Sequence, residues 1–362
     1  MTLSGNLDFA YANVGGTQLI AKGSTVSTGA GTASTSVINI RAVEDLGSGV
    51  KATAHYGLDP RTLVNDSFAV TNNTQGTAAA GNAVGNTATG LARDEAFVGI
   101  EGAFGNIRLG APNSIGLNSF QVASPAGTGV GSGYTGGSTA STMTNSWVNT
   151  RYSRSVRWDS PQIAGFTASY LMAPGNDQPA VAAATTTSGG QSALLIPNAR
   201  KAAEFGLRYD NGPVSVSYAN VKTDAQVNKG GWYAQGSSVA GAAKTSVNMI
   251  NGSYNLGATT LYAGWNDGDQ TTAADTAVKT KGNRYAIKHT VGMVDLMASV
   301  TNQTSGTSDT KAKVTGFRAD YNLSKTAALY VGYEKWDTGT AYNASATTGD
   351  RTITSAGLKK QF

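Results

Sequence analysis

The sequence predicts an all-β fold: one antiparallel transmembrane β-barrel of about sixteen strands that takes up residues 1–362 as a single domain. Segments of roughly ten residues alternate apolar with polar or small side chains, as in a strand with one face toward lipid and the other toward water. The connections between these segments are in turn short and long. The last segment ends at the aromatic Phe362, which we expect to close the barrel and to act as its C-terminal assembly signal.

Seven short connections are predicted to be tight turns at one rim of the barrel. They contain residues that accept a positive φ or start a turn, as a hairpin requires. Together with the closing pair of termini they imply about sixteen strands, an even number that suits an outer-membrane barrel. They lie at residues 46–49, 104–106, 160–165, 210–213, 255–257, 290–292 and 322–325.

The opposite connections are long and rich in Gly, Ser, Thr and Ala. Short periplasmic turns and long extracellular loops are typical of outer-membrane barrels. A soluble β-sandwich is the alternative, but it needs two hydrophobic inner faces and seldom carries so many long loops. The long connections are expected at 15–34, 58–92, 113–147, 174–199, 224–243, 267–280, 304–311 and 338–350.

Charged residues recur on one face of the alternating segments. Ile38 and Ile40 share one face of their segment, and Arg41 lies on the other. Because an Arg or Lys at the bilayer midplane costs about 2–4 kcal/mol, the charged face must line a water-filled lumen. The barrel is therefore a pore or a plugged pore.

Ten aromatic residues are predicted to form girdles at the membrane interfaces. Packing in a soluble core is the alternative role for aromatic residues in strands. The ten are Tyr11, Tyr56, Trp158, Phe166, Tyr170, Tyr209, Tyr218, Tyr254, Tyr321 and Trp336.

Composition argues against several other classes. No run approaches the 18 or more apolar residues of a membrane helix. Cysteine is absent, which excludes disulfides and thiolate metal sites. The net charge of +5 is small, and aromatic residues are not interleaved with basic runs, so we expect no nucleic-acid binding. Met1 begins directly in a strand-like run, so we expect a signal peptide to have been removed or to be absent from this sequence.

Enzymatic activity is not expected. His55 and His289 are the only histidines, and no HExxH, P-loop or GxSxG motif occurs. We expect no cofactor. A structural Ca²⁺ held by loop carboxylates stays open, but no ligand set can be chosen.

Several stretches resemble the Gram-negative porins of the β-proteobacterial type, known from Neisseria and Comamonas. The hairpin AFVGIEGAFGNIRLG at 96–110 is the longest of them, and all occur in family order along nearly the whole chain. The others are 34–36, 44–47, 156–161, 209–213, 253–257, 321–330 and the C-terminal Phe362. The resemblance implies a homotrimer of sixteen-stranded barrels in the outer membrane, in contact with lipid and lipopolysaccharide, with the third long loop (113–147) folded into each lumen.

Selectivity in such a pore depends on its radius and on the wall charges at its narrowest section. The third loop has no Asp, Glu, Lys or Arg from 111 to 150, so it offers only neutral groups such as Asn118 and Gln121. The electric field across the pore must then come mainly from the wall. The wall candidates are Arg41, Arg108, Arg151, Arg157, Arg208 and Arg318, set against Glu95, Glu101, Glu204 and Asp320.

Arg41, Arg108 and Arg157 are the strongest candidates, since they lie on neighbouring strands and match basic positions of the family. Val37, Asp94, Glu95 and Glu101 replace side chains that are often basic there, which argues against strong anion selectivity. We therefore predict a diffusion channel for small hydrophilic solutes and ions with weak to moderate anion preference. The alternatives are a porin selective for a neutral solute, a plugged structural or adhesive barrel, and wall charges that pair and leave little net field.

Overall fold

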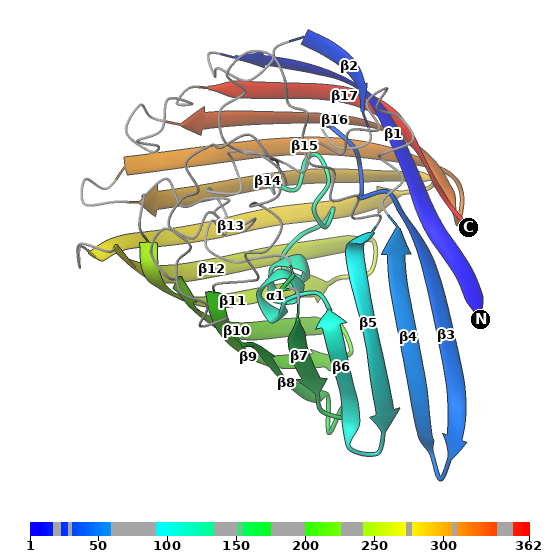
Figure 1. The fold of residues 1–362 in the computed structure, drawn as a ribbon. Helices are drawn as coiled ribbons and strands as arrows, with labels where there is room; N and C mark the ends of the chain where they lie inside the picture. Colours follow the sequence, from blue (N-terminus) through cyan, green and yellow to red (C-terminus); the bar gives the residue numbers. More distant parts are fainter. Residues whose placement is uncertain are drawn as a thin grey trace, which may run out of the picture.

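One antiparallel sheet closes on itself into a barrel (Figure 1). The computed structural model describes residues 1–16, 23–27, 31–58, 92–133, 151–152, 154–174, 200–225, 242–272, 277–305, 310–338 and 350–362. Each of sixteen strands pairs with the next, and β17 pairs with β1 to complete the circle. The additional short strand β2 pairs with the end of β1. The predicted sixteen-stranded barrel is therefore confirmed.

The strands are long because the alternating pattern continues through most of each segment. Their bounds are β1 (Thr2–Gly16), β2 (Gly23–Ser27), β3 (Val37–Gly47), β4 (Val50–Leu58), β5 (Ala92–Gly102), β6 (Gly105–Ala111), β7 (Ser155–Asp159), β8 (Phe166–Ala173), β9 (Arg200–Asn211), β10 (Val214–Ala225), β11 (Ala242–Asn255), β12 (Thr259–Thr272), β13 (Ala277–Val291), β14 (Val294–Ser305), β15 (Thr310–Ser324), β16 (Ala327–Thr338) and β17 (Arg351–Gln361). Among the residues that the structure describes, no helix has the length and hydropathy to cross a membrane.

The seven predicted turns all join consecutive strands at one rim. The turn between β5 and β6 needs a glycine at Gly105, where φ is +98° and an added Cβ would lie 2.1 Å from the carbonyl oxygen of Asp159. The predicted long connection 267–280 is shorter than expected, because β12 and β13 pair as far as Thr271 and Ala277, inside that range. Most of the remaining long connections lie outside the described residues.

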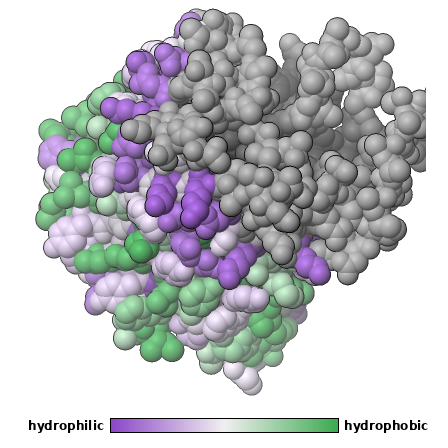
Figure 2. Space-filling model, turned by 90° about the vertical axis from the view of Figure 1, so that its left-hand side faces the viewer, coloured by the Kyte–Doolittle hydropathy of each residue, from purple (hydrophilic) through white to green (hydrophobic). Residues whose placement is uncertain are grey.

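The two faces of the strands differ as the alternation predicts. Val98 is 59% exposed on the outer face, whereas Glu204 is fully buried on the inner one. Figure 2 shows hydrophobic side chains gathered along the outer margin of the face that it draws, with hydrophilic ones nearer the middle. The outer face thus suits lipid, and the inner face carries the charges.

One predicted girdle residue is wrong. Trp336 is 1% exposed and shares the inward parity of Glu334 on β16. It lies in a buried cluster inside the barrel, and the guanidinium of Arg351 stands 4.6 Å from the centre of its ring. Its aromatic character suggested the membrane interface, but its position in the alternation places it on the inner face.

Candidate functional site

Helix α1 (Ile115–Val122) follows β6 and lies inside the barrel (Figure 1). Ser114 caps its N-terminus, since the Ser114 Oγ accepts the N–H of Leu117 at 2.9 Å. The buried carboxylate of Glu204 on β9 accepts two more amides, from Ile115 at 2.6 Å and from Gly116 at 3.1 Å. A carboxylate suits the positive end of the helix dipole. Glu204 therefore fixes the start of the helix to the wall.

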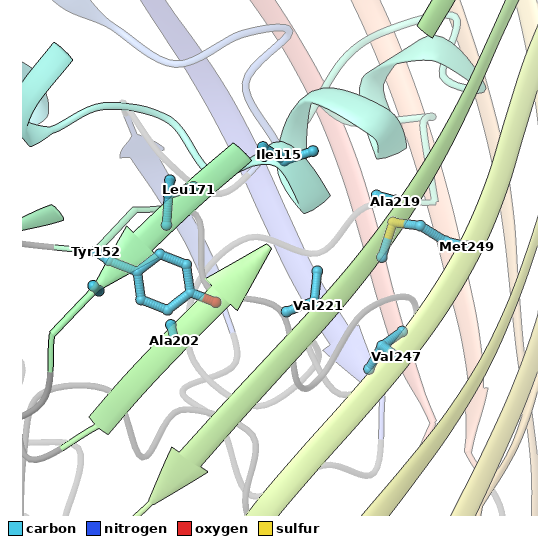
Figure 3. Close-up of a cluster of buried hydrophobic side chains, with 9 residues drawn as sticks. Ile115, Tyr152, Leu171, Ala202, Ala219, Val221, Val247 and Met249 are labelled. Atoms are coloured by element: carbon cyan, nitrogen blue, oxygen red, sulfur yellow. The ribbon is translucent and has the colours of Figure 1, made fainter. Parts of the chain in front are cut away.

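A buried apolar cluster holds α1 against β8–β11 (Figure 3). Ile115 of the helix lies over Gly206 of β9, where an added Cβ would stand 2.4 Å from the Ile115 Cγ2. Only a residue without a side chain allows this approach. The cluster contains Ile115, Tyr152, Leu171, Ala173, Ala202, Ala219, Val221, Val247 and Met249.

The third loop continues from α1 toward the opposite wall (Figure 1). There the Glu334 Oε1 of β16 accepts the N–H groups of Gly131 at 3.0 Å and of Gly133 at 3.1 Å. The Ser299 hydroxyl on β14 donates to the Gly131 carbonyl at 2.7 Å. Residues 113–133 thus extend across the lumen from β8–β11 to β14–β16. The rest of the predicted constriction loop, 134–147, lies outside the described residues, and its role at the narrowest section stays a prediction.

A polar cavity of about 450 Å³ lies between this loop and the wall formed by β5–β10. The loop contributes neutral groups, among them Asn118 and Ser119. The wall contributes charged side chains in equal numbers of each sign. They are Arg108, Arg157, Arg208, Glu95, Asp159 and Asp210.

Asp159 joins the two central arginines. Arg157 contacts it with Nη2 at 2.8 Å and Nε at 3.0 Å, and Arg108 forms a second ion pair with it. Arg157 also donates to the Asn113 carbonyl at 2.7 Å and to the Asn118 side chain, so it links the wall to the third loop. Asp159 is a site residue that the sequence analysis missed.

The spacing of charged residues in the sequence indicates this role of Asp159. In Arg157-Trp158-Asp159 the two charged residues are two positions apart, so they share the inner face of one strand. The same pattern places Asp210 beside Arg208, at 2.6 Å, and Asp320 beside Arg318, at 2.5 Å. An Arg-x-Asp run in a barrel strand therefore indicates a paired arginine.

Three other predicted wall residues, Arg151, Glu101 and Arg41, do not line this cavity. Arg151 pairs with Asp94 near the start of the third loop. Glu101 stands opposite Lys51 across β4 and β5. Arg41 is exposed on β3, and the part of the chain that the structure describes holds no ion pair to it. Of the two loop residues, Asn118 contacts Arg157, and Gln121 is exposed with its Oε1 3.5 Å from the Asn118 Nδ2.

Arg318 lies apart from the cavity. Its side chain is 3% exposed, and it donates to the Ala33 carbonyl of the first loop at 2.7 Å. Its place in the strand alternation directs the side chain inward, as predicted, but Ala33 of the first loop and Gly131 of the third loop cover it. It does not line the cavity and is left out of the proposed selectivity residues.

No cluster of three or more His, Cys, Asp or Glu side chains able to hold a metal ion occurs within the described ranges. A Ca²⁺ held by loop carboxylates stays a prediction.

Comparison with known proteins gives consistent results. The family model described as Gram-negative porin matches residues 1–341. The chain is 31% identical over 188 residues to the major outer membrane protein P.IB of Neisseria gonorrhoeae, a match that spans 51% of this chain and only 40% of that protein. Its fold is similar to that of the anion-selective porin from Comamonas acidovorans, with a TM-score of 0.72 at 20% identity over 100% of this chain and 99% of that one.

A third similarity is to OmpT of Vibrio cholerae in its trimer form, with a TM-score of 0.66 at 10% identity, over 100% of this chain and 98% of that one. At such low identities, the two structural likenesses support the fold alone. The family match covers nearly the whole chain. It agrees with the predicted location in the outer membrane. It also agrees with the prediction that the protein is a channel and not an enzyme. The chain belongs to the Gram-negative porin family.

Proposed function

We propose that this porin is a diffusion channel for small hydrophilic solutes and ions, with a weak to moderate preference for anions. The observation that carries the proposal is the polar cavity between an uncharged loop and a charged wall. Solutes that pass the loop meet neutral side chains on one side and guanidinium groups on the other. Selectivity then depends on the wall.

The proposed anion preference comes from Arg41, Arg108 and Arg157, with smaller contributions from Arg151 and Arg208. It is weak because most of these arginines face a carboxylate at short range. Arg208 is 46% exposed yet still pairs with Asp210. Paired charges leave a small net field, and exposed pairs are screened further by salt. Arg41, which has no ion pair within the described ranges, carries the largest uncompensated charge of the set.

The proposed assembly is a homotrimer in contact with outer-membrane lipid and lipopolysaccharide. The trimer form of OmpT from Vibrio cholerae, which has the same fold, supports the trimer. The aromatic and aliphatic side chains on the outer face of the described strands support the lipid contact. Sedimentation of the purified protein in detergent of known density tests the trimer.

Single-channel recording in a planar bilayer under a tenfold salt gradient tests the function. Steps in groups of three and a reversal potential on the anion side are expected. Arg41→Ser should move the reversal potential toward the cation side, whereas Lys360→Ser, at an exposed position on β17 that contacts Thr326, should not. A cation-side potential in the unmodified protein would overturn the anion preference, and the absence of any steady current would favour a plugged barrel.

A channel selective for a neutral solute is the second candidate. It is favoured by the absence of charged side chains from 111 to 150. Such a channel would show concentration-dependent block of the ionic current by its solute. We expect only proportional, viscosity-like reductions when neutral sugars are added, and saturable block by one sugar would replace the general porin with the selective one.

A further inference from the structure

A segment of the first long loop lies inside the barrel, next to β1. Residues 31–36, here called the strap, are held by Asp8, a buried residue on the inner face of β1. The Asp8 Oδ2 accepts the N–H of Ser34 at 2.7 Å and its hydroxyl at 2.8 Å. The Ser36 Oγ accepts the Asp8 N–H at 2.9 Å, and the Tyr330 hydroxyl donates to the Asp8 Oδ1. One carboxylate thus ties the strap to two strands, β1 and β16.

The strap in turn contacts residues 128–131 of the third loop. The Val130 N–H donates to the Thr32 carbonyl at 2.8 Å. The two backbones touch at Gly129, where an added Cβ would lie 2.0 Å from the Ala33 carbonyl oxygen. Ala33 and Val130 belong to one buried cluster with Ala10 and Tyr330 of the wall. The strap therefore fills the space between β1 and β16 on one side and residues 129–131 on the other.

The described part of the third loop, residues 113–133, is consequently held by different means at its start and at 129–133. At α1 the wall itself binds the loop through Glu204. At 129–133 the wall binds through Glu334, and the strap supplies a second support that depends on Asp8. A loop segment that narrows a pore must be held on both sides of the lumen, since movement on either side changes the open cross-section.

We propose that the strap, anchored by Asp8, positions residues 128–133 of the third loop and so helps to set the width of the pore. Asp8 is a positioning residue, since it does not line the cavity beside β5–β10. The inference rests on the proposed function, in which the third loop narrows a diffusion channel. It adds the strap of the first loop to the elements that set the pore width, and it identifies Asp8 as the residue that holds the strap.

A disulfide across the contact tests the geometry without any current measurement. The chain has no cysteine, so an introduced pair is the only one present. The Thr35 Oγ1 of the strap and the Thr128 Oγ1 of the third loop lie 3.4 Å apart. The double variant Thr35→Cys, Thr128→Cys should form its disulfide rapidly under mild oxidation in the folded, detergent-solubilised protein. Failure to form it in protein that has folded would overturn the proposed contact.

Conductance tests the consequence. Asp8→Ala should give a larger step and more open-channel noise than the unmodified protein, because residues 128–133 of the loop lose a support. Residue 35 lies two positions before β3, so the oxidised cysteine pair would tie the loop to the wall through β3. Combining Asp8→Ala with the cysteine pair should therefore restore the unmodified step when the pair is oxidised and lose it again when dithiothreitol is added. A purely structural role for Asp8 would change the yield of folded protein but would not make the step depend on the disulfide.

Asp295→Ala is the matched control, since it removes an inward-facing carboxylate that contacts Lys288 and Asn322 rather than a loop. It should leave the noise unchanged. If Asp8→Ala does not fold, Ser34→Ala and Tyr330→Phe each remove one donor to the same carboxylate and should give smaller changes of the same sign. If these variants fold and all conduct as the unmodified protein does, the inference is wrong. An unmodified protein without current would instead refute the proposed function.

Discussion

Arg108 on β6 and Arg157 on β7 stand directly opposite each other across the two strands. Like charges in this position destabilise a sheet, because the side chains are close and both point into the lumen. Asp159 offsets the repulsion by pairing with both guanidinium groups. The wall of this porin thus keeps two arginines beside the cavity, and Asp159 cancels about half of their combined charge.

Asp159→Asn should raise the anion preference and destabilise the barrel. The two arginines would lose their shared carboxylate. Because Asp159 is only partly buried, the loss should lie between about 1 kcal/mol for an exposed pair and about 3 kcal/mol for a buried one. The reversal potential under a salt gradient and the free energy of unfolding in urea check the two effects.

Asp210→Asn is the matched control for that change, since Arg208 and Asp210 form a more exposed pair. Exposed pairs contribute up to about 1 kcal/mol, so the stability loss should be smaller than for Asp159→Asn. Equal losses in the two variants would contradict the central role of Asp159.

The anion preference should decline with ionic strength. The screening length is about 10 Å at 0.1 M salt and about 3 Å at 1 M, so the field of the wall arginines reaches much less of the lumen at high salt. Permeability ratios from reversal potentials, measured at fixed gradient and rising mean concentration, should approach one. A ratio that stays constant would point to selection by size or by solute contacts instead of wall charge.

Gly206→Ala should displace α1 from the wall. The new Cβ would lie 2.4 Å from the Ile115 Cγ2, and overpacking of this kind costs about 1–3 kcal/mol. Ile115→Ala in the same chain should recover much of the loss, because it removes the clashing methyl group. A double-mutant cycle in urea measures the coupling.

Gly252→Ala provides the comparison for that cycle. An added Cβ at Gly252 meets no atom nearer than 3.4 Å, so this variant should unfold close to the unmodified protein and show no coupling to Ile115→Ala. Coupling of equal size at both glycines would show that the stability loss in Gly206→Ala does not come from the contact with Ile115 of α1.

Phe362→Ala should impair closure of the barrel. Phe362 and Gly5 exchange backbone hydrogen bonds at 2.9 and 3.1 Å, and the Phe362 ring lies where a Cβ on Gly5 would be 2.6 Å from it. The ring is half exposed, so roughly 2 kcal/mol should be lost, about half of the value for a buried Phe. Folding yield into lipid vesicles measures the loss. Leu323→Ala, an equally exposed apolar position on β15, should fold nearly as well, and a similar deficit there would remove the special role of Phe362.

The sequence by itself determined the barrel. A period of two leaves no choice about which side chains share a face, so the sequence alone places Val98 and Glu101 on opposite sides of their strand. Short turns and paired strands are local features, and hairpin chemistry specifies them within a few residues. Residue type alone misplaces Trp336, because an aromatic side chain suggests the membrane interface. Its place in the strand alternation is what indicates that it faces inward.

Only the tertiary structure decided what covers the inner face. Arg318 and Arg208 have the same parity and the same Arg-x-Asp pattern, yet one is buried by the strap and the other borders the cavity. The difference comes from contacts between segments far apart in the chain, such as Asp8 with Ser34 and Glu334 with Gly131. Such contacts depend on where a loop returns to the wall, and strand periodicity carries no information about that.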